Sequence, residues 1–373
     1  MMRKKRVLLL SEGFGAGHTQ AAQGLSMGLR QLSSNVKTRV LELGAFQHPT
    51  IAPWIFSAYR KTVTNNPNLI GMLYQSYNSK SLSRLSSLAL HRIFYASSAN
   101  IIKQLEPDLI ISTHPFPTVI VSRLKRAGLS TPLCTVITDY DAHGSWVDSA
   151  VNSYLVSTAE VKNKLIQRGV TSEVIQVTGI PVHPKFWRLS NREETRNSLG
   201  LHNMPTVLIM GGGWGLIDNE EIMAYIARWR NQIQLIFCTG NNEKVMQRLA
   251  NDPRFQHPNI HLVGFTKDID KLMDISDLLI TKPGGMTCTE AMAKGIPMLF
   301  YNPIPGQEEE NCQYFSEHGF GETIQSSRTI EAWFRRLLGD EYSSIQQKRY
   351  NNQLNIEYNP QYCSESIIKL LQL

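Results

Sequence analysis

Short apolar runs alternate with amphipathic segments along the whole chain. In the first half, runs rich in branched residues occupy positions 7–10, 40–43, 109–112, 133–137 and 154–157. In the second half, similar runs occupy positions 207–210, 235–239, 260–263, 278–281 and 298–301. The segment 19–32 between two such runs places Ala21, Ala22, Leu25, Leu29 and Leu32 on one helical face. Strands that alternate with helices predict an α/β protein with doubly wound parallel sheets.

The pattern repeats, and so predicts two domains in a chain of 373 residues. Each half opens with a strand that runs into glycines, "VLLLSEGFGAGH" and "VLIMGGGWG". The segment "TGIPVHPKFWRLSNREE" between the halves has two prolines and a polar tail, which is typical of a hinge. We therefore expect a first domain at 1–178, a hinge at 179–194 and a second domain at 195–355. A closing helix at 356–373 is expected to pack back on the first domain.

The cysteines and the apolar runs exclude several classes of protein. Five scattered cysteines, none of them in a CxxC pair, argue against a disulfide framework or a zinc site and fit a reducing cytoplasm. The basic start "MMRKKR" is followed by only four apolar residues, too few for a signal peptide. No apolar run approaches the length of a membrane-spanning helix.

Charge divides unevenly between the halves. Residues 1–178 carry a net charge of +10 and residues 179–373 a net charge of −3. No acidic residue lies between Glu42 and Glu106, where bulky apolar residues are mixed with basic ones. These are Arg60, Lys61, Lys80, Arg84, Arg92 and Lys103. The segment 46–103 therefore favours a surface that lies on anionic lipid, and the alternative is a helical lid with a solvated basic face. Nucleic acid is not an expected partner, because no recognisable binding module accompanies the charge.

The stretch "TKPGGMTCTEA" is the strongest candidate for ligand binding. A strand that ends at Thr281 meets a tight Pro-Gly-Gly turn, and a helix follows. Backbone amides of Gly285, Met286 and Thr287 would form a cradle for phosphate at the helix N-terminus. Glu290, one turn further, is suited to ribose hydroxyls. The alternative is a glycine turn with a capped helix and no ligand.

The loop "PGQEEEN" follows the next strand and begins another helix. It carries Gln307, Glu308 and Asn311, whose carboxamides and carboxylate are suited to sugar hydroxyls.

These motifs resemble those of glycosyltransferases that build diacylglycerol glycolipids. Five stretches carry the resemblance, which covers nearly all of the chain: "SEGFGAGH", "VITDYDAHGSW", "VTGIPVHPKF", "VLIMGGGWG" and "TKPGGMTCTEA…PGQEEEN". The family comprises processive diacylglycerol glucosyltransferases and monogalactosyldiacylglycerol synthases, relatives of the peptidoglycan N-acetylglucosaminyltransferase. The resemblance implies the GT-B fold, in which two Rossmann-like domains face across a cleft. It places the lipid acceptor on the N-terminal domain and the UDP-sugar on the C-terminal one.

The resemblance also implies a donor site and an acceptor side. The implied donor-binding residues are Gly212, Gly213, Phe265, Lys282, Pro283, Gly284, Gly285, Met286, Thr287, Glu290, Gln307, Glu308 and Asn311. Among them, the glycines of the Pro-Gly-Gly turn hold the diphosphate and Phe265 contacts the uracil. The acceptor side is implied to contain Gly15, Gly17, Asp139, His143 and Trp146. For Trp146, filling the interdomain face is an equal alternative.

Transfer with inversion needs a base for the acceptor hydroxyl, and His18 is the candidate. Histidine titrates near neutral pH, and the preceding glycines would let an acceptor lie against the backbone. The alternative is a histidine that fastens its own turn. Glu12 is expected to orient the imidazole. Asp139 and Asp141 match a DxD metal motif of a different glycosyltransferase fold, and we interpret the match as chance, with no metal site and no cofactor.

The sequence thus predicts an inverting glycosyltransferase that moves glucose or galactose from a UDP-sugar to diacylglycerol or a related lipid. It would work at the cytoplasmic face of the cell membrane, as a peripheral protein. One alternative is a UDP-sugar enzyme with another acceptor or none, as in an epimerase. The other is a UDP-sugar sensor without catalysis.

Overall fold

The computed structural model describes residues 3–13, 16–50, 54, 57, 98–211, 219–345, 347 and 358–372. The chain divides into two compact units. Unit 1 comprises residues 1–187, 304–310 and 358–373, and unit 2 comprises residues 188–303 and 311–357. The division between Trp187 and Arg188 falls inside the segment expected as a hinge.

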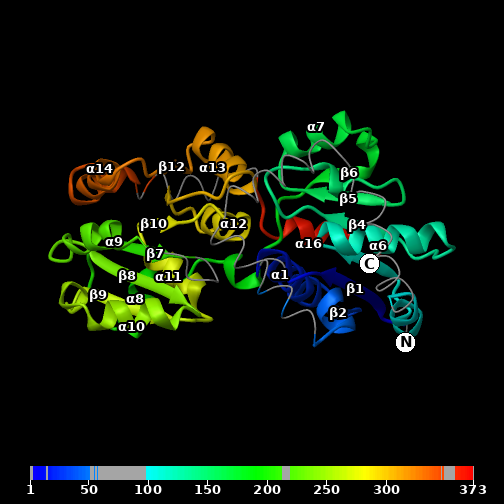
Figure 1. Ribbon diagram of the computed structural model, residues 1–373, viewed down its shortest axis with the longest axis horizontal. Coiled ribbons are helices and arrows are strands. Elements are labelled where there is room, and N and C mark those ends of the chain that lie inside the picture. The colour runs from blue at the N-terminus through cyan, green and yellow to red at the C-terminus, as the bar shows by residue number, and fades with distance from the viewer. Residues whose placement is uncertain are drawn as a thin grey trace. The chain divides into compact units, whose positions relative to one another are not determined.

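Unit 1 is built on a six-stranded parallel sheet with strand order β2-β1-β3-β4-β5-β6 (Figure 1). Its strands are β1 (Lys5–Ser11), β2 (Val36–Glu42), β3 (Leu109–Ser112), β4 (Leu133–Val136), β5 (Ser153–Val156) and β6 (Ile175–Val177). Its helices are α1 (Ala16–Leu32), α2 (Leu43–Gln47), α6 (Pro115–Arg126), α7 (Ala159–Gln167) and α16 (Tyr362–Leu370). Short 3-10 turns lie at η1 (Gly144–Trp146), η2 (Ser172–Val174) and η3 (Pro184–Phe186). The prediction of parallel α/β layers is confirmed.

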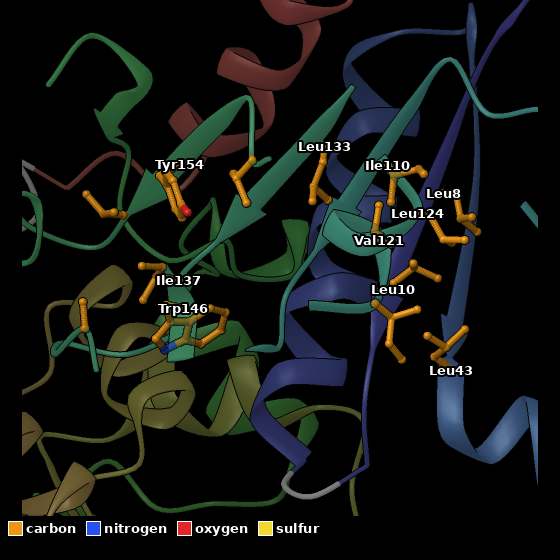
Figure 2. Packing of buried hydrophobic residues seen from close by; sticks show 14 of the residues in the cluster. Leu8, Leu10, Leu43, Ile110, Val121, Leu124, Leu133, Ile137, Trp146 and Tyr154 are labelled. Atoms are coloured by element: carbon orange, nitrogen blue, oxygen red, sulfur yellow. The ribbon is translucent and has the colours of Figure 1, made fainter. Parts of the chain in front are cut away.

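Alternate residues of the central strands enter two different hydrophobic clusters. Leu8 and Leu10 belong to a cluster with Trp146 and Tyr154 (Figure 2), whereas Val7 and Leu9 belong to a cluster with residues of α1 and α16. Both faces of β1 are therefore buried, which explains why its sequence is a continuous apolar run. Each such leucine contributes about 1.5–3 kcal/mol through burial.

The helix α16 belongs to unit 1 although it follows all of unit 2 in sequence. It packs on α1, where a Cβ added at Gly28 would come within 2.4 Å of Ser364 Oγ. Gln176 Nε2 donates hydrogen bonds to Tyr362 Oη at 3.1 Å and to Ser366 Oγ at 3.0 Å. Close packing and hydrogen bonds thus hold this helix on the first sheet.

Unit 2 contains a second six-stranded parallel sheet, with strand order β12-β11-β10-β7-β8-β9. Its strands are β7 (Thr206–Met210), β8 (Gln234–Gly240), β9 (Ile260–Gly264), β10 (Leu278–Thr281), β11 (Met298–Phe300) and β12 (Gly321–Thr323). Its helices and turns are α8 (Arg192–Ser198), α9 (Glu220–Ala227), α10 (Glu243–Asn251), η4 (Pro253–Phe255), α11 (Ile269–Ile275), α12 (Gly285–Ala293) and α14 (Ser327–Leu338). The helix α13 (Gln307–Glu317) begins in unit 1 and continues in unit 2. In chain order this sheet has the Rossmann arrangement 3-2-1-4-5-6.

A buried ion pair at the end of α12 fastens the start of unit 2. Lys294 Nζ lies 2.9 Å from Asp274 Oδ2, and it also donates to the carbonyl of Arg188 at 2.6 Å. The backbone N–H of Ser190 donates to the same Asp274 oxygen at 3.2 Å. These contacts hold residues 188–190 against α11 and α12.

The described residues contain neither a candidate membrane span nor a cluster of metal-ligating side chains. No described helix is long and apolar enough to cross a membrane. Among the same residues, no three His, Cys, Asp or Glu side chains are grouped so that they could hold a metal ion.

Candidate functional site

The sheet order of unit 1 defines one edge where a ligand can bind. Strand β1 has β2 on one side and β3 on the other, so the strand order changes direction between β1 and β3. Ligands on such sheets bind outside the carboxyl ends of the strands at this position. The chain leaves β1 at Ser11 towards His18, and it leaves β3 at Ser112 towards His114. Both histidines therefore lie at the expected edge.

His18 is the third residue of α1 and is held at two atoms. Its ring Nδ1 lies 2.6 Å from Thr138 Oγ1, just beyond the end of β4. Its backbone carbonyl accepts a hydrogen bond of 3.0 Å from Thr113 Oγ1. The ring meets that of His114 edge to face, with centroids 4.7 Å apart and planes at 87°. The position and orientation of the imidazole are thus fixed by the two segments that follow β3 and β4.

Two more rings complete the cluster around His18. Trp146 is fully buried, with its ring centroid 6.2 Å from that of His18 and 5.9 Å from that of His143. His143 Nδ1 lies 2.5 Å from Ser145 Oγ. The structure therefore brings together two of the residues expected on the acceptor side and the expected base.

Burial keeps all three imidazoles of this cluster neutral at pH 7. It lowers the pKa of His18 to about 4, with the Thr113 backbone opposing and His143 adding to the decrease. Burial also lowers the pKa of His143 to about 4. The pKa of His114 is held well below its ordinary value by burial and by the two neighbouring histidines.

Asp139, the residue after Thr138, is a buried carboxyl with an unusual proton affinity. Burial raises its pKa to about 7; the hydrogen bond from Gln307 opposes this, and Asp141 adds to it. Gln307 Nε2 donates to Asp139 Oδ1, and both residues belong to unit 1. Asp141 is paired with Lys164 Nζ at 2.6 Å. Each of the two aspartates therefore has a side-chain partner within unit 1.

Glu12 has a different position from the one expected. Its Oε2 accepts the backbone N–H of Gly44 at 2.7 Å, and its Oε1 accepts that of Gly13 at 3.2 Å. Burial raises its pKa to about 7 against these two hydrogen bonds. One carboxyl oxygen thus fixes the start of α2 and the other fixes the turn after β1. The side-chain partner of the His18 ring is Thr138, in place of Glu12.

In unit 2, the helix α12 begins directly after β10 and the Pro-Gly-Gly turn. Strand β10 lies beside β7, which is where the order of this second sheet changes direction. The N-cap residue Gly284 makes no side-chain cap to the helix. A Cβ at Gly284 would meet no atom within 4 Å, and its φ is −70°. The fold itself therefore does not require glycine at this position.

The loop that precedes α13 is braced by its own polar side chains. Glu308 Oε2 accepts the backbone N–H of Ile304 at 2.8 Å. Asn311 is fully buried and donates from Nδ2 to the carbonyl of Pro283 at 3.0 Å. Asn311 thus connects α13 to the Pro-Gly-Gly turn, and its expected contact with a sugar stays a prediction.

The other expected donor residues vary in exposure. Phe265, after β9, has 67% of its surface exposed. Lys282, Thr287 and Glu290 are partly buried, whereas Pro283, Gly285 and Met286 are buried. Gly15, Gly212 and Gly213 lie outside the described residues, as does most of the basic segment 46–103. Gly17 lies in α1, next to His18.

Sequence reasoning missed two residues of the His18 cluster. Thr138 was not considered, although it stands directly before the expected Asp139. His114 is absent from the expected site residues, and among the described residues its ring centroid lies closer to that of His18 than the Trp146 centroid does. The available signal was position: both follow a buried strand, at the edge where β1 also ends.

Comparisons with known proteins cover both units. Residues 18–182 match the family model of monogalactosyldiacylglycerol (MGDG) synthase, and residues 206–359 match that of the glycosyltransferase family 28 C-terminal domain. The chain is 30% identical over 354 residues to a processive diacylglycerol beta-glucosyltransferase of Bacillus cereus, which covers 93% of this chain and 89% of that protein. A protein of the same description from Bacillus thuringiensis is 30% identical over 355 residues, with the same coverage.

Solved structures resemble the chain at lower identity. MurG of Acinetobacter baumannii superposes with a TM-score of 0.63 at 15% identity, over 99% of each chain. HepE of Anabaena in complex with UDP-glucose superposes with a TM-score of 0.60 at 15% identity, over 98% of this chain and 99% of that one. A UDP-GlcNAc 2-epimerase of Neisseria meningitidis superposes with a TM-score of 0.62 at 15% identity, over 99% of this chain and 100% of that one. Because transferases and an epimerase share this fold, the fold alone does not separate them.

Proposed function

Because the chain belongs to the monogalactosyldiacylglycerol synthase family of glycosyltransferases and has their GT-B fold, we propose that it transfers glucose or galactose from a UDP-sugar to diacylglycerol, with inversion at the anomeric carbon. The observation that carries this proposal is the neutral, hydrogen-bonded imidazole of His18 at the carboxyl edge of the first sheet. A transferase to an alcohol needs a proton acceptor, and a neutral imidazole at this edge of the sheet supports the assignment of His18 to that role.

The reaction then proceeds as a single displacement. The lipid hydroxyl attacks the anomeric carbon, its oxygen forms the new C–O bond, and its proton passes to His18. The bond between the anomeric carbon and the phosphate oxygen breaks, and the electron pair leaves on UDP. Because burial disfavours the imidazolium, His18 gives up this proton readily after transfer and returns to its neutral form.

The open end of α12 is the proposed site of the diphosphate. The amides of Gly285, Met286 and Thr287 have no side-chain cap from Gly284, and the helix dipole favours negative charge at that end. The charge that develops on the leaving UDP would be stabilised by the same groups. In this proposal Phe265 packs on the uracil, and Glu290 and Glu308 accept hydrogen bonds from ribose and hexose hydroxyls.

The segment 46–103 is the proposed contact with anionic lipid at the cytoplasmic face of the cell membrane. Two described side chains near its start are apolar and exposed: Phe46 at 49% and Trp54 at 78%. Aromatic residues beside a basic segment are typical of proteins that bind a membrane surface. Replacement of Arg60, Lys61, Arg84 and Arg92 with Gln should weaken sedimentation with anionic vesicles, and unchanged sedimentation would contradict this part.

Incubation with UDP-glucose or UDP-galactose and diacylglycerol vesicles tests the reaction. We expect a hexosyl-diacylglycerol by mass spectrometry, and its anomeric proton coupling by NMR should report the β configuration from an α-linked donor. Consumption of UDP-sugar without lipid would indicate an epimerase-like enzyme. Binding of UDP-sugar with no turnover under any lipid condition would indicate a sensor.

A further inference from the structure

The contact between Thr138 and His18 determines which ring nitrogen can accept a proton. Thr138 is 3% exposed, and its hydroxyl lies 2.6 Å from Nδ1 of His18. The two residues are 120 positions apart in sequence, so the fold of unit 1 creates the contact. For the part of the chain that the structure describes, it is the one side-chain hydrogen bond of this ring.

A neutral imidazole has one N–H, so two arrangements satisfy this contact. In the first, Nδ1–H donates to the threonine oxygen and Nε2 keeps a free lone pair. In the second, the hydroxyl donates to Nδ1 and Nε2 carries the proton. The Thr113 backbone also makes a hydrogen bond with the ring that raises the pKa of His18, so it accepts from a ring N–H in either arrangement. Only the first arrangement leaves a nitrogen that can take a proton from an acceptor hydroxyl.

We propose that Thr138 is a positioning residue that accepts a hydrogen bond from Nδ1–H of His18 and thereby makes Nε2 the proton-accepting atom. The inference rests on the proposed function, because it assigns the atoms of the same base. The threonine oxygen accepts from Nδ1–H both before and after Nε2 is protonated. The ring therefore keeps its orientation through the reaction, as a histidine fixed by a hydrogen-bond acceptor does in other enzymes.

His114 provides an internal contrast. Its Nδ1 accepts the backbone N–H of Phe116 at 3.1 Å, and a backbone amide can only donate. Neutral His114 therefore carries its proton on Nε2, the opposite tautomer from the one proposed for His18. Two adjacent histidines are thus assigned different roles: His114 caps α6, and His18 accepts the proton.

The test compares Thr138→Val, which keeps the shape and removes the hydroxyl, with Thr138→Ser, which keeps the hydroxyl. For Thr138→Val we expect kcat to fall by about 10- to 100-fold, the effect of losing one buried hydrogen bond to a reacting group. The KM for UDP-sugar and the affinity for UDP should stay within about twofold. Thr138→Ser should recover most of the activity.

Ring ¹⁵N NMR of the full-length protein, with His18→Ala used for assignment, reads the tautomer directly. We expect an Nδ1–H pattern for His18 in the wild type and in Thr138→Ser, and loss of that pattern in Thr138→Val. Thr113→Val is the matched control, because its hydroxyl contacts the His18 backbone and not the ring. It should lower thermal stability and leave the tautomer signals unchanged.

The two proposals fail in different ways. An Nε2–H pattern in the wild type, or equal kcat for Thr138→Val and wild type, would overturn the role of Thr138 even if the glycolipid forms. Absence of glycolipid product would overturn the proposed function even if the Nδ1–H pattern is found.

Discussion

The rings of His18 and His114 meet edge to face with their centroids 4.7 Å apart, and burial keeps both neutral at pH 7. Their polar contacts are distinct, since His18 Nδ1 meets Thr138 and His114 Nδ1 caps a helix. Under the proposed function, this pair places the proton acceptor, His18, beside a histidine that caps a helix.

Replacement of His18 with Ala should reduce kcat by about two to four orders of magnitude, the range for loss of a general base. UDP affinity should remain within about twofold, because the proposed diphosphate site lies in unit 2. Steady-state kinetics and calorimetric titration with UDP measure the two effects. His202→Ala, an exposed histidine of unit 2, is the control and should change neither. A collapse of UDP binding in His18→Ala would show that the residue is structural.

Asp139→Asn should remove one pH-dependent contribution to stability. The folded pKa of Asp139 is raised from an ordinary 3.8 to about 7 by burial, so the folded state holds a proton that the unfolded state lacks between these values. The stabilisation that the protonated Asp139 carboxyl contributes is fully present below about pH 4, and it is lost as pH rises to about 7. The free energy of unfolding of Asp139→Asn relative to wild type should therefore increase across that window, by an amount on the order of a few kcal/mol, and the Tm difference should increase with it. His18 and His143, with pKa values of about 4, make stability rise with pH in both the wild type and the variant. Their contributions therefore cancel when the two proteins are compared. A constant difference in Tm from pH 4 to pH 8 would contradict the raised pKa.

Gly284→Ala should separate binding from folding. A Cβ at this position would meet no atom within 4 Å, so we expect unchanged or slightly higher stability and weaker binding of UDP-sugar. Gly321→Ala is the converse control, because its Cβ would lie 2.6 Å from the Phe300 ring and should destabilise unit 2. Thermal denaturation and UDP titration of both variants distinguish the two effects. Equal UDP affinity for Gly284→Ala and wild type would exclude a diphosphate at this turn.

Phe265→Ala should weaken UDP binding without loss of stability. The side chain is 67% exposed, so its removal leaves no cavity, whereas stacking of an aromatic ring on a base contributes about 1–3 kcal/mol. We expect UDP affinity to fall by about 5- to 100-fold. Leu338→Ala, at 39% exposure on α14, is the matched surface control. The contact with uracil is contradicted if both variants bind UDP equally well.

The buried pair of Lys294 and Asp274 should be sensitive to removal of one partner. Lys294→Met leaves a buried carboxylate without its cation, which typically costs about 3–5 kcal/mol. Lys294→Met combined with Asp274→Asn removes both charges and keeps an acceptor for Ser190 N–H. Urea denaturation should show the double variant to be the more stable of the two. If the single variant is the more stable, the pair does not act as a compensated buried charge.

The sequence was sufficient for the central strands and for the edge strand β9, and it was insufficient for the other three edge strands. Strands β1, β3, β7 and β10 are buried on both faces, so each is a continuous apolar run that is easily recognised. β6 and β12 are three-residue edge strands and were not predicted. β2, also at an edge, begins four residues before its predicted start because polar residues alternate along its exposed face.

The candidate site was partly predictable for a related reason. His18 follows a glycine-rich turn after a buried strand, which is a local signal. The hydroxyl of Thr138 is joined to it only by the fold, and no spacing in the sequence encodes that distance. The carboxylate of Glu12 is adjacent to the same turn in sequence, yet its oxygens are used by the amides of Gly13 and Gly44.

The position of α16 has a consequence for biosynthesis. This helix contributes Cys363 and Ile367 to the core beneath β1, yet the ribosome makes it after every strand of both sheets. Part of one apolar face of unit 1 therefore stays uncovered until unit 2 has been translated. We expect nascent chains to bind chaperones during that interval. The folding of unit 1 is then completed only after unit 2 has been synthesised.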